Sequence, residues 1–393
     1  MSVATRPESD IDLFTEEALL DPYPLYTELR AAGPAVWLNR LGVYALPRYA
    51  DVRAAGRNWE VFSSQRGVML NEELNEMVGG GVTLCVDPPE HDTMRQVLRR
   101  PLTGDRLTEI APRLRTEAER LVGRLVEQRT FDAVADMARH LPLRVVSNLV
   151  GIPEEGREKM LEWAFASFDA QGPMSPRTAA SGEIASQMIA YSLNEAVPPK
   201  LRPGGWAQQL YDAAARGEIP AERCPMMLLD YLGPSLDTTI NATSSAIWLF
   251  AEHPDQWDAV RREPSLIPNA INEVLRLESP VQHFSRYVNE DVDIDGVPVA
   301  AGSRVTFLYG SANRDERRWE DPETFDVRRA RVAEHVAFGF GPHACVGASL
   351  ARLELRTLLE ALVERVNRFE VRRTERVTNQ VLRGLTTLEV AVT

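Results

Sequence analysis

Residues 338–347 read Phe-Gly-Phe-Gly-Pro-His-Ala-Cys-Val-Gly, and they decide how the rest of the chain is interpreted. Three glycines, a proline and Cys345 lie between a strand-like run, His335 to Phe338, and a helical pattern that begins near Ala348. A cysteine at a helix N-terminus has its thiolate form favoured, because the helix dipole and free backbone N–H groups stabilise negative charge on sulfur. Such a thiolate can bind haem iron, and glycine lets the backbone approach a flat macrocycle where a Cβ would clash.

The fixed positions of this stretch, Phe-Gly-x-Gly-x-His-x-Cys-x-Gly, resemble the haem-binding loop of the cytochrome P450 family. The resemblance implies a mainly α protein with small β-sheets. Its fold would be a triangular helical prism in which haem b (iron protoporphyrin IX) lies between a long central helix and the Cys-bearing loop. Cys345 would be the metal ligand, with Phe338 and Gly347 in the cofactor-binding loop. Two other interpretations are a buried structural cysteine beside a turn, and a zinc or thiol enzyme that uses Cys345 and His343.

Composition limits the kind of protein. The chain has 393 residues, of which 44% are apolar and 26% charged, as in globular proteins. No Gly/Ser linker or Pro-rich spacer divides it, so we expect a flexible segment over residues 1–20 and a single catalytic domain over residues 21–393. The net charge of −13 argues against nucleic acid or an anionic membrane as partner. The three cysteines are widely spaced, which favours a reducing compartment, and the N-terminus has no apolar anchor, so we expect a location in the cytoplasm. The resemblance also implies a monomer.

A pair of basic residues suits the edge of a haem. Asp87-Pro88-Pro89 predicts the start of a helix on which His91 and Arg95 lie four apart and share one face. Haem propionates need cationic or N–H donors where they are partly buried. The pattern His-x-x-x-Arg resembles the propionate-binding pair of the family, and the resemblance adds Arg286 and His343 to this set. Taken alone, the pair would be interpreted as a surface pair.

Residues 221–252 form the longest helical pattern, and at about 1.5 Å per residue such a helix would cross the whole molecule. Pro234 interrupts it, because the ring lacks an N–H and clashes with the carbonyl one turn earlier, so we expect a kink or bulge. The family has an acid followed by threonine over the iron. This implies that Asp237 relays protons and that Thr238 holds the water that receives them. Pro234-Ser235 replaces the Ala/Gly-Gly pair usual there, so we expect a thicker wall over the haem.

The substrate is suggested by more local likenesses. Three stretches resemble bacterial enzymes that oxidise para-substituted benzoates, especially 4-methoxybenzoate: residues 64–68, 279–282 and 310–314. Phe165, Phe168 and Phe284 suit a planar ring. Arg66 suits a carboxylate, because a guanidinium binds one with two hydrogen bonds, although a solvated loop arginine is the plainer interpretation.

The predicted substrate pocket is lined by residues from five regions. They are Arg66, Phe165, Phe168, Leu229, Gly233, Pro234, Val281, Phe284 and Leu385, the last at the tip of a C-terminal turn. Leu229 and Asp230 count against an acidic substrate, since they occupy the helix face where a second positive or hydroxyl group would be expected. A neutral small aromatic compound or a terpenoid is therefore the main alternative.

Other elements follow from pattern. Helices are predicted over residues 107–128, 178–195, 267–277 and 348–366, and residues 62–81 are predicted to be loop-rich. Glu273 and Arg276 lie three apart on one of these helices. In the family such a Glu-x-x-Arg is a buried structural ion pair bonded to the loop around the cysteine. An arginine of the stretch Asp326 to Arg329 would be the third member.

The resemblance implies a haem-thiolate monooxygenase that hydroxylates a C–H bond, or removes a methyl group where that carbon carries an alkoxy oxygen. The chain has no flavin, nicotinamide or iron–sulfur motif, so electrons from NAD(P)H would arrive through a ferredoxin and its reductase. A basic patch, Arg99, Arg100 and Arg106, would dock the acidic ferredoxin. The alternatives are a peroxide-driven peroxygenase and a non-catalytic haem sensor or carrier.

Overall fold

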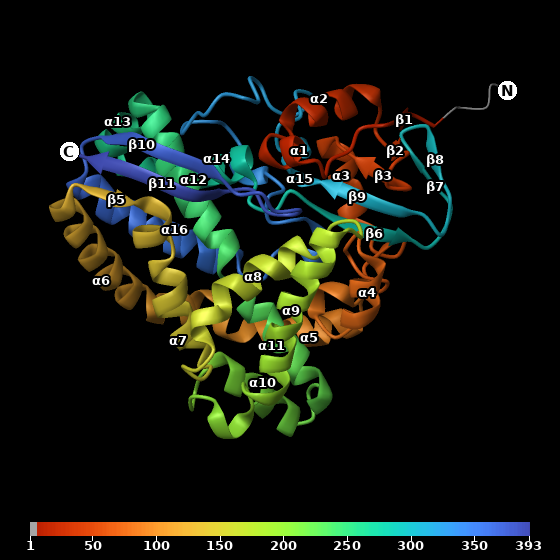
Figure 1. The fold of residues 1–393 in the computed structure, drawn as a ribbon, viewed down its shortest axis with the longest axis horizontal. Coiled ribbons are helices and arrows are strands. Elements are labelled where there is room, and N and C mark those ends of the chain that lie inside the picture. Colours follow the sequence, from red (N-terminus) through yellow and green to blue (C-terminus); the bar gives the residue numbers. More distant parts are fainter. Residues whose placement is uncertain (1–5) are drawn as a thin grey trace.

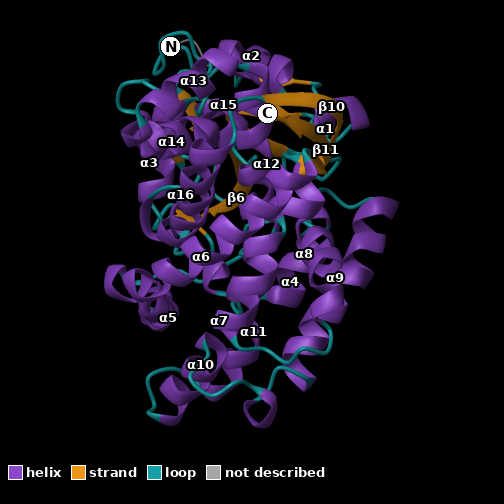
Figure 2. Cartoon of the chain, turned by 90° about the vertical axis from the view of Figure 1, so that its left-hand side faces the viewer, coloured by secondary structure: helices purple, strands orange, loops and turns teal. Residues whose placement is uncertain are grey.

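The computed structural model describes residues 6–393, and helices make up most of it, with the strands toward one end (Figure 1 and Figure 2). This confirms the mainly α fold with small β-sheets. The α-helices are α1 Glu16–Leu20, α2 Tyr23–Ala32, α3 Tyr49–Arg57, α4 Glu72–Val78, α5 Glu90–Arg99, α6 Gly104–Gln128, α7 Ser147–Val150, α8 Met160–Asp169, α9 Pro176–Asn194, α10 Trp206–Ala215, α11 Cys224–Leu232, α12 Asp237–Glu252, α13 Pro254–Arg262, α14 Ile267–Glu278, α15 Tyr309–Ala312 and α16 Ala348–Arg365.

The strands belong to three small sheets. They are β1 Glu8–Ser9, β2 Val36–Leu38, β3 Val43–Leu46, β4 Phe62–Ser63, β5 Thr130–Asp132, β6 His283–Val288, β7 Val292–Ile294, β8 Val297–Val299, β9 Arg304–Leu308, β10 Phe369–Arg376 and β11 Leu385–Val392. The largest sheet has the order β1-β2-β3-β9-β6-β4, the second β10-β11-β5, and β7 pairs with β8. Within the largest, β6 runs antiparallel to β9 with Arg286 opposite Val305, which fixes the position of Arg286.

The long helix α6 packs against α16, which leads away from the Cys-bearing loop. Its buried side chains recur at helical spacing, among them Leu114, Leu121 and Leu125, so one face is apolar and covers α16. The core that these helices share continues through α12 and α14. The loop at the start of α16 therefore rests on the main hydrophobic core.

The central helical pattern is divided into two helices. α11 ends at Leu232 and α12 begins at Asp237, so residues 233–236 are not helical. Leu236 has φ −95° and ψ −80°, outside the helical region. Ser235 Oγ donates to the carbonyl of Tyr231, and Thr238 Oγ1 donates to the carbonyl of Pro234 at 2.7 Å. These side chains satisfy carbonyls that an unbroken helix would have bonded, and the interruption predicted at Pro234 is present.

Two segments differ from expectation. Of the N-terminal segment predicted to be flexible, residues 1–5 lie outside the described residues, but Glu8 and Ser9 pair with β2 and α1 follows. The region 62–81, predicted to be loop-rich, contains α4. Asn71 caps this helix by accepting from the N–H of Leu74 at 3.1 Å, and two glutamates occupy its first turn. Within residues 6–393, no helix combines the length and the apolar character needed to cross a membrane.

A buried ion network joins α14 to the segment before the Cys-bearing loop. Arg276 donates to both carboxylate oxygens of Glu273, at 2.7 and 2.9 Å, and both side chains have no exposed area. Arg329 is the third member and donates to Glu273 Oε1 at 2.9 Å. Arg276 also donates to the carbonyls of Asn313 and Pro322, both at 2.8 Å. The Glu273–Arg276 pair therefore bonds to the chain upstream of the Cys-bearing loop. The predicted direct bond to that loop is absent among these contacts, and the connection to the loop is indirect.

That indirect connection passes through Asn313. Its carbonyl accepts from Arg276, its Nδ2 donates to Ser279 Oγ at 2.8 Å, and its Oδ1 accepts from the N–H of Val336 at 2.7 Å. Val336 lies two residues before Phe338, where the loop begins. The ion network thus fixes one end of the loop, while the core under α16 fixes the other.

We expect Arg276→Ala to lower the free energy of unfolding by about 3–5 kcal/mol, because it leaves Glu273 and several carbonyls buried without their partner. Arg356→Ala is the matched control, since Arg356 forms an exposed pair with Glu360 and its loss should cost less than about 1 kcal/mol. Denaturant unfolding of the haem-loaded proteins measures both values. Equal losses in the two variants would contradict a structural role for the buried network.

Candidate functional site

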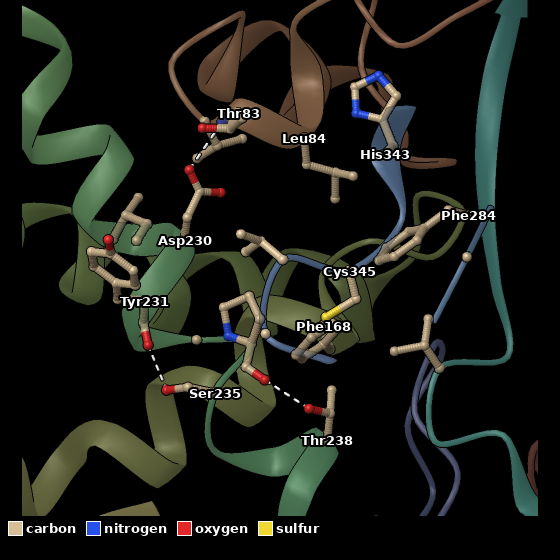
Figure 3. A pocket seen from close by; sticks show the side chains of 18 of the residues that line it. Thr83, Leu84, Phe168, Asp230, Tyr231, Ser235, Thr238, Phe284, His343 and Cys345 are labelled. Carbon is tan, nitrogen blue, oxygen red and sulfur yellow. Dashed lines mark hydrogen bonds between the residues drawn. The ribbon is translucent and has the colours of Figure 1, made fainter. Parts of the chain in front are cut away.

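A cavity of about 320 Å³ lies between the Cys-bearing loop, α11, the 233–236 break, α5 and β6. Most of its lining is apolar. Of the predicted site residues it brings together His91, Arg95, Arg286, Phe338, His343, Cys345 and Gly347 from the cofactor set, Thr238 from the catalytic pair, and Phe168, Leu229, Gly233, Pro234, Val281 and Phe284 from the substrate set. Residues from the two halves of the chain thus face one internal space (Figure 3).

The loop holds Cys345 with its side chain pointing into this cavity (Figure 3). The N–H of Cys345 donates to the carbonyl of Phe338 at 2.8 Å, which closes the loop. Gly341 has φ +79°, and a Cβ there would lie 1.9 Å from the carbonyl oxygen of Gly56 in α3. The need for glycine at this position therefore comes from close packing on α3, beside any contact with a cofactor.

The environment of the sulfur contains opposing effects. Burial raises the pKa of the Cys345 thiol, whereas the N–H groups of Gly347 and Ala348 and the guanidiniums of Arg95 and Arg352 favour the thiolate. Burial is the largest effect, so the helix N-terminus alone does not lower the pKa as the sequence suggested. A metal cation at the sulfur would deprotonate the thiol outright. The donors around Cys345 are placed to stabilise the charge that remains.

Two imidazoles and two guanidiniums gather at one side of the cavity. The rings of His91 and His343 approach to 4.4 Å between centroids, and both Nε2 atoms are buried without a hydrogen-bond partner. Burial lowers the pKa of His91 and lowers that of His343 to about 4, so both rings are neutral near pH 7, and Nδ1 of His91 lies 2.9 Å from Asp92 Oδ1. Arg286 is buried on β6, and Arg95 donates to the carbonyl of Ala344 in the loop. The group suits the carboxylates of a haem.

The residues present fit a haem. A thiol faces the cavity from the loop, mainly apolar side chains line the interior, and two imidazoles whose Nε2 atoms lack a partner stand with two guanidiniums at one edge. An iron-binding sulfur, a macrocycle and two propionates would each meet a group of matching chemistry. Cys345 would hold the iron, while His91, Arg95, Arg286 and His343 would hold the propionates.

Residues 233–235 of the break line the cavity, and Thr238 lines it beside them. Because the hydroxyl of Thr238 donates to the carbonyl of Pro234, its oxygen remains able to accept a hydrogen bond. Asp237 does not line the cavity, and its Oδ2 is buried without a partner. Burial raises the pKa of Asp237 to about 7, with Arg139 acting in the opposite direction. A carboxyl with this pKa can take up and release a proton near neutral pH.

Three predicted substrate contacts lie elsewhere. Arg66 is exposed, and its guanidinium lies 4.3 Å from the ring centroid of Tyr287, outside the cavity. Phe165 does not line the cavity, although Phe168 on the same helix does. Leu385 is buried within β11, opposite Arg376 of β10. The C-terminal segment instead reaches the cavity wall through Val381 and Leu382, which pack with Phe168, Val281 and Phe284.

Two carboxyl groups in the lining were not among the predicted site residues. Asp230 projects from α11, where it is the single acid in an otherwise apolar run, Pro225 to Leu232. Glu354 lies on α16 on the same side as Cys345, is fully buried, and has one oxygen without a partner. Burial raises the pKa of Glu354 to about 8. An isolated acid in an apolar helical face was the signal that could have identified both residues.

The basic patch is partly neutralised. Arg100 pairs with Glu218, and Arg106 pairs with Glu109 at 3.0 Å. Arg99 is exposed at the end of α5. The patch follows α5 directly, and α5 also carries His91 and Arg95. A partner bound there would lie at the outer end of a helix whose other residues line the cavity.

Comparison with known proteins gives one consistent result. A family model described as Cytochrome P450 matches residues 207–389. The curated protein "Cytochrome p450 CYP199A2" of Rhodopseudomonas palustris is 36% identical over 391 residues, covering 98% of this chain and 95% of the relative. "Linalool 8-monooxygenase" of Pseudomonas putida is 31% identical over 412 residues, covering 98% and 99%.

Solved structures agree in fold. P450BioI in complex with an acyl carrier protein ligated to hexadec-9Z-enoic acid superimposes with a TM-score of 0.84 at 26% identity, covering 96% of this chain and 100% of that one. CYP109E1 from Bacillus megaterium in complex with testosterone gives 0.84 at 26% identity, covering 96% and 99%.

The buried Glu354 should make stability depend on pH. The folded protein keeps this proton up to about pH 8, whereas the unfolded chain loses it near 4.5. Folded protein therefore binds more protons between these values, and its stability falls as pH rises from 5 to 8. We expect Glu354→Gln to reduce that fall by on the order of 2 kcal/mol.

Denaturant unfolding of the haem-loaded proteins at pH 5 and pH 8 measures the difference. Glu364→Gln removes an exposed carboxylate from the same helix and serves as control. The same pH dependence in Glu354→Gln and wild type would show that Glu354 is not buried as described.

Proposed function

Given that this chain belongs to the cytochrome P450 family and is a haem-dependent monooxygenase, we propose that it oxidises a small, largely apolar substrate held between Cys345 and the 233–236 break. The observation that carries this proposal is the position of the Cys345 thiol and Thr238 in the lining of one mainly apolar cavity. The mainly apolar lining, with few polar groups, suits a small apolar molecule.

When bound through Cys345, haem supplies the activation of O2 that places one oxygen atom on the substrate and releases the other as water. The chain's own residues supply position and protons. Thr238 keeps its hydroxyl hydrogen on the carbonyl of Pro234 and can accept from a water molecule in the cavity. Asp237, buried behind it with a pKa of about 7, can pass protons from the interior toward that water.

The lining favours a neutral skeleton over an aromatic acid. Phe168 and Phe284 suit a planar ring, which keeps a para-substituted methoxyarene among the substrates and O-demethylation among the reactions. The carboxylate of a benzoate would have no cation to pair with. Arg66 is exposed outside the cavity, and the cations that line the cavity would be engaged by the haem propionates. Asp230 would also repel the carboxylate. The proposal is therefore a substrate without a carboxylate, which includes the neutral alternative.

Electrons would reach the haem from redox partners, for which a ferredoxin and its NAD(P)H-dependent reductase are proposed. Arg99 supplies exposed positive charge close to the helix that borders the cavity. In a chain of net charge −13, such a local basic patch would steer an acidic partner to one face.

Proton delivery separates this proposal from a peroxide-driven enzyme. With ferredoxin, reductase and substrate supplied, we expect Thr238→Ala to form about tenfold less product per NAD(P)H consumed, because water is no longer held for proton transfer. Thr238→Ser keeps the hydroxyl and should restore the ratio. Parallel assays of product and NAD(P)H consumption measure it. An undiminished ratio in Thr238→Ala would instead favour peroxide-driven turnover.

Substrate charge is tested by a matched pair of ligands. We expect neutral 4-methoxytoluene to shift the Soret band of the ferric protein to the high-spin position and to be demethylated to 4-methylphenol and formaldehyde. We expect 4-methoxybenzoate to bind at least about tenfold more weakly, because its carboxylate would be buried without a cation. Tighter binding of the benzoate would overturn the preference for a substrate without a carboxylate and support the aromatic-acid function.

A further inference from the structure

Asp230 gives the cavity a charged group that oxygen activation does not use. The residue lies in α11, seven positions before Asp237, and its neighbours in the lining include Leu84 and Leu229. Burial raises the pKa of Asp230 to about 6, opposed by hydrogen bonding from Thr83 and by the charge of Arg95. The carboxyl group is therefore ionised at neutral pH although apolar side chains surround it.

The carboxylate is held but only partly satisfied. Its Oδ2 accepts from the N–H of Thr83 at 3.0 Å, which is its one hydrogen bond among residues 6–393. Figure 3 shows one oxygen at Thr83 and the other turned toward the interior. A carboxylate can accept about four hydrogen bonds, so most of its capacity faces the cavity. Thr83 Oγ1 beside it is also buried without a partner.

The other charged groups of the lining have different roles. His91, Arg95, Arg286 and His343 form the set that fits the propionates, and haem binding would engage them. Glu354 lies on α16, the helix that follows the Cys345 loop, and burial keeps it protonated at neutral pH because its pKa is about 8. On the side formed by α11, Asp230 is thus the anion that a substrate would meet.

We propose that Asp230, with Thr83 Oγ1 beside it, is a specificity-determining site that binds a protonated amine on an otherwise apolar substrate. Burying the Asp230 carboxylate without a cation costs free energy. An ammonium that donates to it offsets this cost, because charge-assisted hydrogen bonds are strong in a dry cavity. The inference rests on the proposed function, since it names the substrate class of the same site.

The fold also indicates how such a substrate would be arranged. Asp230 lies on α11 and Thr238 on α12, on the two sides of the 233–236 break, and both line the cavity. A substrate that reaches both residues would carry its amine at one end and its reacting carbon at the other. A 4-methoxyphenethylamine skeleton has this arrangement, with the ring suited to Phe168 and Phe284.

The test uses ligands that differ only in charge. N,N-dimethyl-2-(4-methoxyphenyl)ethylamine is compared with its neutral isostere 1-methoxy-4-(3-methylbutyl)benzene and with 3-(4-methoxyphenyl)propanoate. Isothermal titration of the haem-loaded ferric protein gives each dissociation constant, and the Soret band distinguishes a high-spin shift from direct binding of nitrogen to iron. We expect the amine to bind at least about tenfold more tightly than the isostere, and the propanoate weakest.

Asp230→Asn keeps the shape of the side chain and removes its charge. We expect it to weaken amine binding about tenfold or more and to leave binding of the neutral isostere unchanged. Asp212→Asn removes an exposed carboxylate from α10 and controls for the change in net charge.

Equal affinities of wild type for the amine and the isostere would overturn the proposal, and this comparison needs no variant. Unchanged amine binding in Asp230→Asn would also overturn it. A carbon-monoxide spectrum of each sample reports separately on the haem-thiolate centre. Failure of the proposed function would appear there, and failure of the amine site only in the titrations.

Discussion

The carboxylate of Glu273, held between the guanidiniums of Arg276 and Arg329, is the interaction on which the site depends. Neither Glu273 nor Arg276 has exposed area, so each charge is stable only while its partner is present. The same guanidinium bonds carbonyls of residues 313 and 322, in a stretch without long helices or strands. In this stretch, hydrogen bonds from side chains hold the backbone in place, as secondary structure does elsewhere. They therefore fix the position of the first residues of the Cys-bearing loop.

Where the 233–236 break lines the cavity, the chain is not helical. A continuous helix over residues 221–252 would direct its backbone polar groups to one another. At the break, the hydroxyl of Thr238 donates to the carbonyl of Pro234, and the hydroxyl of Ser235 donates to the carbonyl of Tyr231. One side chain thus obtains a fixed orientation in the cavity. Pro234 enforces the interruption that a pair of small residues would merely permit.

Sequence was most informative where the signal is local. The loop at 338–347, the interruption at Pro234 and the amphipathic face of α6 each depend on neighbouring residues, and each is present. Helix α4 is short and lies between glycines at 67 and 79–81 that favour a loop, so the cap at Asn71 alone does not predict it. Tertiary packing determined the rest. Phe165 and Phe168 lie on one helix, yet only Phe168 reaches the cavity. The third member of the ion network could not be chosen among adjacent arginines, because only the folded chain brings Arg329 to Glu273.

Binding of haem iron by the Cys345 thiolate in this cavity is tested most directly by one spectrum. The reduced protein is treated with carbon monoxide and the difference spectrum is recorded for wild type and for Cys345→Ser. We predict a band near ~450 nm in wild type and its loss in the variant, because only thiolate-ligated haem gives that band. No such band in wild type, or its persistence without the sulfur of Cys345, would show that Cys345 does not hold the iron.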